Sequence, residues 1–219
     1  MSDGKLIDLS HTVEHGMITY KGLPAPIICD YLSHEASRER YAAGTEFQIG
    51  KIEMVANTGT YLDSPFHRYP DGDDLSQLKL KTLADLDCVV ARVTNRAIDR
   101  LPIDLATLRG KALLLHTGWD AHWRTDQYFE QHPHLTGGLA EQLVDAGITL
   151  VGIDSFNIDS TDDGTRPVHS ALLGAGIPIV EHMCGLGGVP EHGARFFAVP
   201  VKVKGMGTFP VRAFVRAPK

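Results

Sequence analysis

Two short runs in this chain are almost continuously apolar, and they limit its fold more than any other feature. They are residues 111–117 (KALLLHT) and 148–154 (ITLVGID). A strand with one face in water alternates apolar and polar side chains, whereas a continuously apolar strand is buried on both faces. Such strands occur in sheets that helices cover, so the pattern predicts an α/β fold.

Further short β-like runs predict the rest of the sheet. They are residues 5–11, 47–55, 87–93, 177–181, 195–203 and 209–215. Helices are predicted over 138–147, which ends at the capping residue Gly147, and over 167–174, which begins at Pro167. Residues 122–131 are a third helical candidate. Since 219 residues suffice for one sizeable core, we expect residues 1–219 to form a single domain with a mixed sheet.

Two connections are longer than usual, residues 31–46 and 154–166. Both flank polar clusters, so we interpret them as lids over a site.

The composition excludes several classes of function. The net charge is −6 and basic residues form no block, which argues against nucleic-acid binding. No apolar run approaches the ~20 residues of a membrane span, and the N-terminus lacks a secretory pattern. The three cysteines, Cys29, Cys88 and Cys184, are odd in number and far apart. This pattern is typical of the reducing cytoplasm.

The stretch 56–67 (ANTGTYLDSPFH) concentrates polar side chains around one glycine. A straight strand would separate the Cα atoms of Asn57 and Asp63 by ~20 Å. Gly59 permits a sharp bend, and Pro65 prevents the strand from continuing toward His67. The stretch is therefore predicted to converge its side chains on a site. A plain polar turn capped by Asp63 is the alternative at this point.

Two more polar clusters follow buried runs, where sites in α/β folds gather. His169 lies just after Pro167, and Glu181 ends the apolar run IPIV. The alternative for Glu181 is pairing with His182 or Arg195. Four residues at other strand ends are assigned to a supporting or substrate-contacting role: His11, Trp119, Asp154 and Asp159. The remaining histidines in the region 122–134 are interpreted as surface residues.

These fragments, in their order and spacing, resemble the cyclase-like hydrolases, a family that includes bacterial kynurenine formamidase and isatin hydrolase. The matching fragments are DLSH (8–11), TGTYLDSPFH (58–67), HTGWD (116–120), GIDS (152–155), HSALL (169–173), IVE (179–181) and PVRA (210–213). The resemblance implies a swivelling β/β/α fold. It also implies a homodimer or homotetramer with the site near subunit contacts.

The family signature is H-x-G-T-H-x-D-x-P-x-H, in which the first two histidines and the aspartate bind zinc or manganese. The resemblance implies that Asp63, His169 and Glu181 are metal ligands and that His67 is the catalytic acid and base. This chain departs from the signature at two positions, because Asn57 and Tyr61 stand where the metal histidines are expected.

A carboxamide oxygen binds zinc weakly, and a neutral phenol binds it more weakly still. Three arrangements therefore remain open. We favour one divalent metal, zinc or manganese, held by Asp63, His169 and Glu181 with His67 or water. A metal-free site would use His67 and Tyr61, and a two-metal site would add Asn57 and Tyr61 as ligands.

The resemblance leads us to expect a hydrolase of a small amide, cyclic amide, lactone or formyl amide. Water attacks a carbonyl, His67 moves the proton, Asp63 helps to bind the water, and Tyr61 can donate to the oxyanion. The alternatives are a metal-independent cyclase or dehydratase and a non-catalytic small-molecule-binding protein. The aromatic content of 7% does not indicate an aryl pocket. Arg68 is a candidate for binding a substrate carboxylate, but we favour the interpretation that it is a solvated or lid residue.

Overall fold

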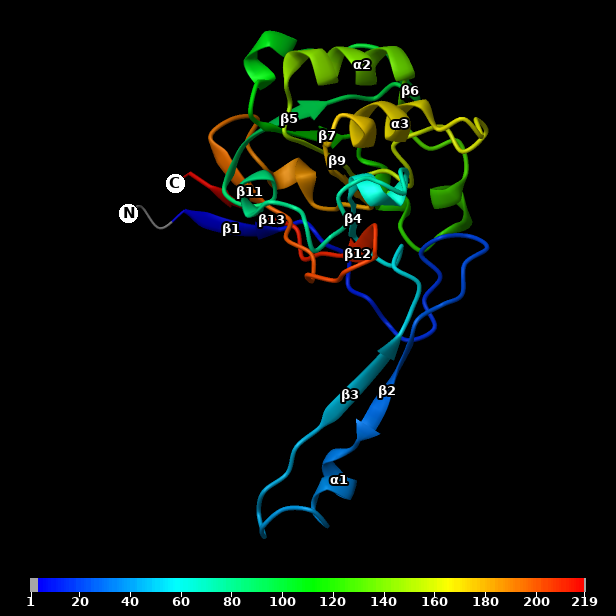
Figure 1. The fold of residues 1–219 in the computed structure, drawn as a ribbon, viewed down its shortest axis with the longest axis vertical. Coiled ribbons are helices and arrows are strands. Elements are labelled where there is room, and N and C mark those ends of the chain that lie inside the picture. Colours follow the sequence, from blue (N-terminus) through cyan, green and yellow to red (C-terminus); the bar gives the residue numbers. More distant parts are fainter. Residues whose placement is uncertain (1–3, 219) are drawn as a thin grey trace.

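A nine-stranded mixed sheet forms the centre of the molecule (Figure 1). The structure is a computed structural model and describes residues 4–218. In spatial order the strands are β1 (Lys5–Asp8), β13 (Phe214–Ala217), β11 (Ala194–Phe197), β5 (Leu86–Arg92), β7 (Ala112–His116), β9 (Leu150–Ile153), β10 (Ile179–Glu181), β4 (Tyr61–Asp63) and β12 (Thr208–Pro210). The four strands from β5 to β10 are parallel, and the flanking strands pair antiparallel. The predicted α/β fold with a mixed sheet is confirmed.

Two helices, α2 (Gly137–Ala146) and α3 (Pro167–Gly174), cover one face of this sheet (Figure 1). Strand β7 shows why both faces are apolar: Leu113 and Leu115 pack toward the helices, and Leu114 packs into a second core on the other face. Helix α2 begins after Thr136, whose hydroxyl accepts from a backbone N–H, and ends at Gly147 with φ of 74°. Both helix predictions hold to within one residue.

The third helical candidate, residues 122–131, is instead two 3₁₀ turns, Trp119–His122 and Asp126–Phe129. The remaining short elements are β6 (Ala97–Ile98), β8 (His134–Leu135) and 3₁₀ turns at Pro65–His67, Leu80–Thr82, Leu105–Leu108 and Leu186–Gly188.

A hairpin arm, residues 27–53, projects away from the body (Figure 1). It consists of β2 (Ile27–Leu32), helix α1 (His34–Ser37) and β3 (Ile49–Glu53), and β3 pairs with β2 alone. The prediction that residues 31–46 form a lid is therefore wrong, because these residues point away from the body. Large apolar side chains on the arm are exposed, and Tyr31 (73%), Ile52 (57%) and Phe47 (53%) are the most exposed of them.

Strand β4 lies between β10 and β12 and fixes two pairs of opposed residues. Tyr61 is opposite Glu181 on β10, and Asp63 is opposite Thr208 on β12. Directly opposed residues on neighbouring strands share a face, as do residues two apart on one strand. All four side chains therefore lie on the face that α3 covers. The turn before β4 bends at Gly59, whose φ is 67°, as the sequence predicts.

Candidate active site

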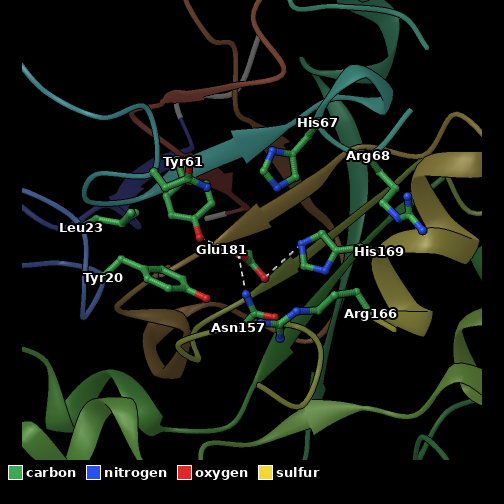
Figure 2. A pocket seen from close by; sticks show the side chains of 10 residues that line it. Tyr20, Leu23, Tyr61, His67, Arg68, Asn157, Arg166, His169 and Glu181 are labelled. Carbon is green, nitrogen blue, oxygen red and sulfur yellow. Dashed lines mark hydrogen bonds and ion pairs between the residues drawn. The ribbon is translucent and has the colours of Figure 1, made fainter. Parts of the chain in front are cut away.

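A cavity of about 290 Å³ lies where β4, β10 and the start of α3 meet (Figure 2). Its lining residues come from six segments of the chain. They are Tyr20, Leu23, Asn57, Tyr61, His67, Arg68, Asn157, Arg166, His169 and Glu181. Ligand cavities in proteins generally span ~300–1,000 Å³, so this one suits a small molecule.

The opposed pair on β4 and β10 forms one hydrogen bond across the cavity floor. The buried Tyr61 hydroxyl donates to Glu181 Oε2 at 2.6 Å. Burial and the neighbouring carboxylates raise the pKa of Tyr61 well above its usual value, so the phenol keeps its proton. A protonated phenol that donates to a carboxylate does not offer a metal the charge of a phenolate. The two-metal arrangement with Tyr61 as a ligand is therefore not supported.

The other carboxylate oxygen of Glu181, Oε1, accepts from the backbone N–H of Ile158 at 2.6 Å. Burial is the main influence on Glu181 and raises its pKa to about 7. Asn157 approaches Oε2 at 3.5 Å. Glu181 is thus tied on both oxygens. The alternative pairing of Glu181 with His182 or Arg195 is not found among the described residues, and Arg195 instead pairs with Asp85 and Asp87.

His169 is oriented by Asp159, which comes from the loop after β9. Its Nδ1 lies 2.6 Å from Asp159 Oδ2, and both oxygens of this carboxylate also accept backbone N–H groups in the first turn of α3. A carboxylate only accepts, so Nδ1 carries the proton. The other nitrogen, Nε2, faces Asp63 Oδ2 at 3.8 Å and Glu181 Oε1 at 3.7 Å.

His67 is held by Asp63 through Thr208. The Thr208 hydroxyl donates to Asp63 Oδ1, and Thr208 Oγ1 lies 2.9 Å from His67 Nδ1. Because the hydroxyl proton goes to the carboxylate, the Thr208 oxygen is left to accept from Nδ1–H. Neutral His67 therefore has its lone pair on Nε2. The backbone also fixes this residue, since a Cβ added at Gly207 would lie 2.5 Å from His67 Cα.

The acid–imidazole group fits one divalent cation. Asp63, His67 and His169 each bring one donor atom into a group whose members lie within 4.8 Å of one another. Asp63 Oδ2 is buried and has no hydrogen-bond partner among the described residues. Burial alone would lower the pKa of His169, but the hydrogen bond to Asp159 and the nearby carboxylates of Asp63 and Glu181 raise it to about 10. The carboxylates here thus attract positive charge, as a metal site does.

The expected ligands were Asp63, His169 and Glu181 with His67 or water, and Asn57 was an additional candidate. The compact group holds three of these residues, Asp63, His67 and His169, and Glu181 Oε1 lies 3.7 Å from His169 Nε2. Glu181 accepts hydrogen bonds from Tyr61 and from the backbone N–H of Ile158. Asn57 lines the cavity on the phenol side.

Three of the expected supporting residues lie outside the cavity. His11 stacks on Trp123 with ring centroids 3.8 Å apart. Asp154 accepts from Thr117 and Gly118 and so organises the loop after β7. Trp119 donates from Nε1 to the Tyr128 carbonyl at 3.0 Å.

Two histidines are more deeply buried than the sequence indicates. His132, which we interpreted as a surface residue, is 2% exposed. His182 is fully buried, has a positive φ of 54°, and places Nε2 3.5 Å from the Tyr61 hydroxyl. Burial is the main influence on His182 and lowers its pKa to about 3, so it is neutral. The His182 ring packs against the Tyr61 ring, with centroids 5.0 Å apart.

Sequence reasoning missed four residues of the site: Thr208, Asn157, Tyr20 and Arg166. Thr208 acts from a strand 145 positions beyond Asp63, and no local pattern reports such a pairing. Arg166 had one usable signal, since it directly precedes the proline that starts α3. Tyr20 and Asn157 lie in loops without a distinctive pattern.

Comparison with known proteins gives consistent matches over most of the chain. Residues 7–160 match the profile of the family described as "Putative cyclase". A kynurenine formamidase from Bacillus cereus is 28% identical over 217 residues, with 99% of both chains covered. A solved potential metal-dependent hydrolase with cyclase activity has a TM-score of 0.78 at 24% identity, covering 98% of each chain. Isatin hydrolase A from Labrenzia aggregata has a TM-score of 0.80 at 19% identity, covering 98% and 94%.

Proposed function

This chain belongs to the cyclase family, and from that premise we propose that it is an amide-bond hydrolase acting on a small formyl amide or related amide. The kynurenine formamidase relative, matched end to end, supports this class of reaction. The cavity of about 290 Å³ is consistent with a substrate of about one ring.

The observation that carries the proposal is the chain of contacts from Asp63 through Thr208 to His67. It presents the His67 Nε2 lone pair as a general base beside the buried Asp63 and His169. In the proposed reaction His67 takes a proton from water as the water attacks the substrate carbonyl. The resulting imidazolium then protonates the leaving amine. Proton transfer of this kind contributes ~10²–10⁴-fold to rate.

Asp63 and His169 are the proposed anchors for one divalent cation, zinc or manganese, with Glu181 Oε1 or His67 within reach as a third donor. Such an ion would polarise the carbonyl and stabilise the negative charge that develops on it. Asp159 supports this role, because a carboxylate on the far nitrogen of a histidine orients it toward a metal.

The position of Tyr61 favours hydrolysis over cyclisation by proton transfer alone. The latter needs Tyr61 as an acid toward the substrate, but its hydroxyl proton is directed at Glu181. His67 retains a free nitrogen with no such commitment.

A substrate panel with metal analysis tests the proposal. Purified protein is expected to contain about one equivalent of zinc or manganese and to hydrolyse formanilides, whose aniline product is read by absorbance. His67→Ala is expected to keep its metal and lose turnover by roughly 10²–10⁴-fold, whereas the exposed-surface control His192→Ala keeps its activity. Full activity of His67→Ala would refute the assignment. Loss of its metal would make His67 a ligand instead of the base.

We also propose that the chain forms a homodimer or homotetramer through the arm. A two-stranded hairpin is marginally stable alone in water. Tyr31, Phe47 and Ile52 expose apolar surface there that a second copy would cover. Light scattering is expected to give an oligomer for the wild type and a smaller species for Tyr31→Ser/Phe47→Ser. The arm control Glu39→Ser should match the wild type, and an unchanged mass of the double variant would refute this role.

The cysteines support a cytoplasmic location. Cys29, Cys88 and Cys184 are all free thiols. No helix within residues 4–218 is long and apolar enough to cross a membrane.

A further inference from the structure

Two arginines line the active-site cavity, and neither has an acidic partner. Arg68 follows His67, and Arg166 immediately precedes α3 (Figure 2). Within residues 4–218, neither guanidinium lies within 4.0 Å of a carboxylate oxygen, although Glu181 lines the same cavity. The arginines that do form ion pairs with acids within residues 4–218 lie outside the cavity, as Arg212 does with Asp8.

Both side chains are held at the same end of α3. Arg68 Nε donates to Ser170 Oγ at 3.2 Å, and Arg166 Nη1 donates to the Ser160 carbonyl at 3.0 Å. Each contact uses one guanidinium N–H group, and a guanidinium has five. Burial raises the pKa of Tyr20, and Arg166 lies close enough to the Tyr20 hydroxyl to oppose that rise. The other donors of the two guanidiniums can bind a ligand. Arg166 also adopts a positive φ of 50°, a strained conformation for a residue with a side chain, and such strain is concentrated at functional sites.

From these contacts we propose that the cavity takes a substrate that carries a carboxylate, bound by Arg68 and Arg166 while its amide lies over Asp63 and His67. This inference rests on the proposed function, because it assigns the anionic end of the same substrate. Guanidinium–carboxylate hydrogen bonds are the strong, geometrically specific kind.

The opposite wall limits the rest of the substrate. Tyr20 and Leu23 stand across the cavity from Arg68 in Figure 2 and provide an aromatic ring and an apolar side chain. The low overall aromatic content therefore does not describe this wall. A flat ring between the amide and the carboxylate fits both the wall and the volume.

The test compares formanilide with its ortho, meta and para carboxylates, because the spacing between amide and anion is then sampled. The wild type is expected to prefer at least one carboxylate isomer over formanilide by about tenfold or more in kcat/KM, as expected for charge-assisted hydrogen bonds. This preference should fall to near unity in Arg68→Gln and Arg166→Gln. Gln and Arg are equally strained by the positive φ at position 166. Arg166→Gln therefore removes the charge without changing the backbone strain.

Two matched variants sharpen the result. Arg68→Lys keeps the charge and should retain part of the preference, and Arg100→Gln removes an exposed arginine elsewhere and should retain all of it. The preference should also weaken as salt rises. Equal kcat/KM for all four compounds, or a preference that survives both Gln variants, would overturn the inference.

A binding measurement separates this inference from the proposed function. Benzoate and benzamide are titrated calorimetrically against the wild type and Arg68→Gln. If no formanilide is hydrolysed but benzoate binds and loses at least about tenfold in affinity in Arg68→Gln, the hydrolase proposal fails and the anion site stands. If formanilide is hydrolysed and benzoate binds no better than benzamide, the anion site fails alone.

Discussion

The active-site region has an acid–imidazole side around Asp63 and a phenol–amide side around Tyr61. Both are formed by β4 and the turn before it, but their chemistry differs. On the acid–imidazole side, Asp63 keeps one buried oxygen without a hydrogen-bond partner, beside His169 and His67. On the phenol–amide side, the hydrogen of Tyr61 is given to Glu181, and Asn57 adds a neutral amide. The acid–imidazole side attracts a cation, whereas on the phenol–amide side the Glu181 carboxylate already accepts the hydroxyl proton of Tyr61. The contrast shows that one strand can place a carboxylate that attracts a cation and a phenol that keeps its proton on the same face of the sheet.

Removing the charge of Asp63 should have the largest effect, because it removes the feature that distinguishes the acid–imidazole side from the phenol–amide side. Asp63→Asn is expected to lose the metal and to lower kcat/KM by about 10³-fold or more, equivalent to ~4 kcal/mol. In the proposed site this carboxylate would hold the cation and, through Thr208, position the base. Metal content and kcat/KM measure the effect, with the surface change Asp145→Asn as the control. Retention of both metal and activity would contradict the assignment.

Thr208 should matter next, because it transmits the position of Asp63 to His67. Thr208→Val keeps the strand and the volume but removes the hydroxyl, and misplacing a catalytic group can cost ~10²-fold. We expect kcat to fall by about that amount in Thr208→Val, with metal content unchanged, and to recover in Thr208→Ser. Equal rates for the Val and Ser variants would remove the hydroxyl from the mechanism.

Converting the phenol–amide side tests whether the two sides differ by their ligands alone. Asn57→His/Tyr61→His is expected to raise metal content from about one equivalent to two, because imidazole binds zinc and manganese well. Equilibrium dialysis followed by elemental analysis reads this directly. A value that stays at one would mean that the backbone on this side has also moved out of ligand geometry.

Tyr61→Phe should have the smallest effect on turnover. Its hydroxyl serves Glu181, so kcat should fall less than about tenfold, below the ~10²–10³-fold loss expected of an oxyanion donor. The cost should appear in stability. Leaving a buried acceptor unpaired costs ~1–3 kcal/mol, or roughly 2–4 °C in Tm per kcal/mol for a chain of this size. A loss of turnover beyond about 10²-fold would instead place the phenol on the substrate.

The sequence was informative where a residue acts through its neighbours in the chain. Gly147 ends α2, Pro167 begins α3, and Gly59 bends the turn before β4, each through local backbone preferences. It was silent where strands distant in sequence meet. The contact from Asp63 to Thr208 depends on the register of β12 against β4, which neither segment encodes alone.

The arm was misread for a related reason. The sequence predicts residues 47–55 as a strand of the central sheet, but Ile49 and Ile52 are exposed on a separate hairpin formed with β2. A pattern of apolar residues indicates that a surface is buried. It does not indicate whether the same chain or a second copy buries it.

The proposed association through the arm would make the stability of the protein depend on its concentration. If a second copy covers Tyr31 and Phe47, association and folding are linked by mass action, and Tm should rise as the protein is concentrated. Dilution to assay conditions would then release the arms and lower the measured stability without any change in sequence. Variants of this chain are therefore best compared at one fixed concentration.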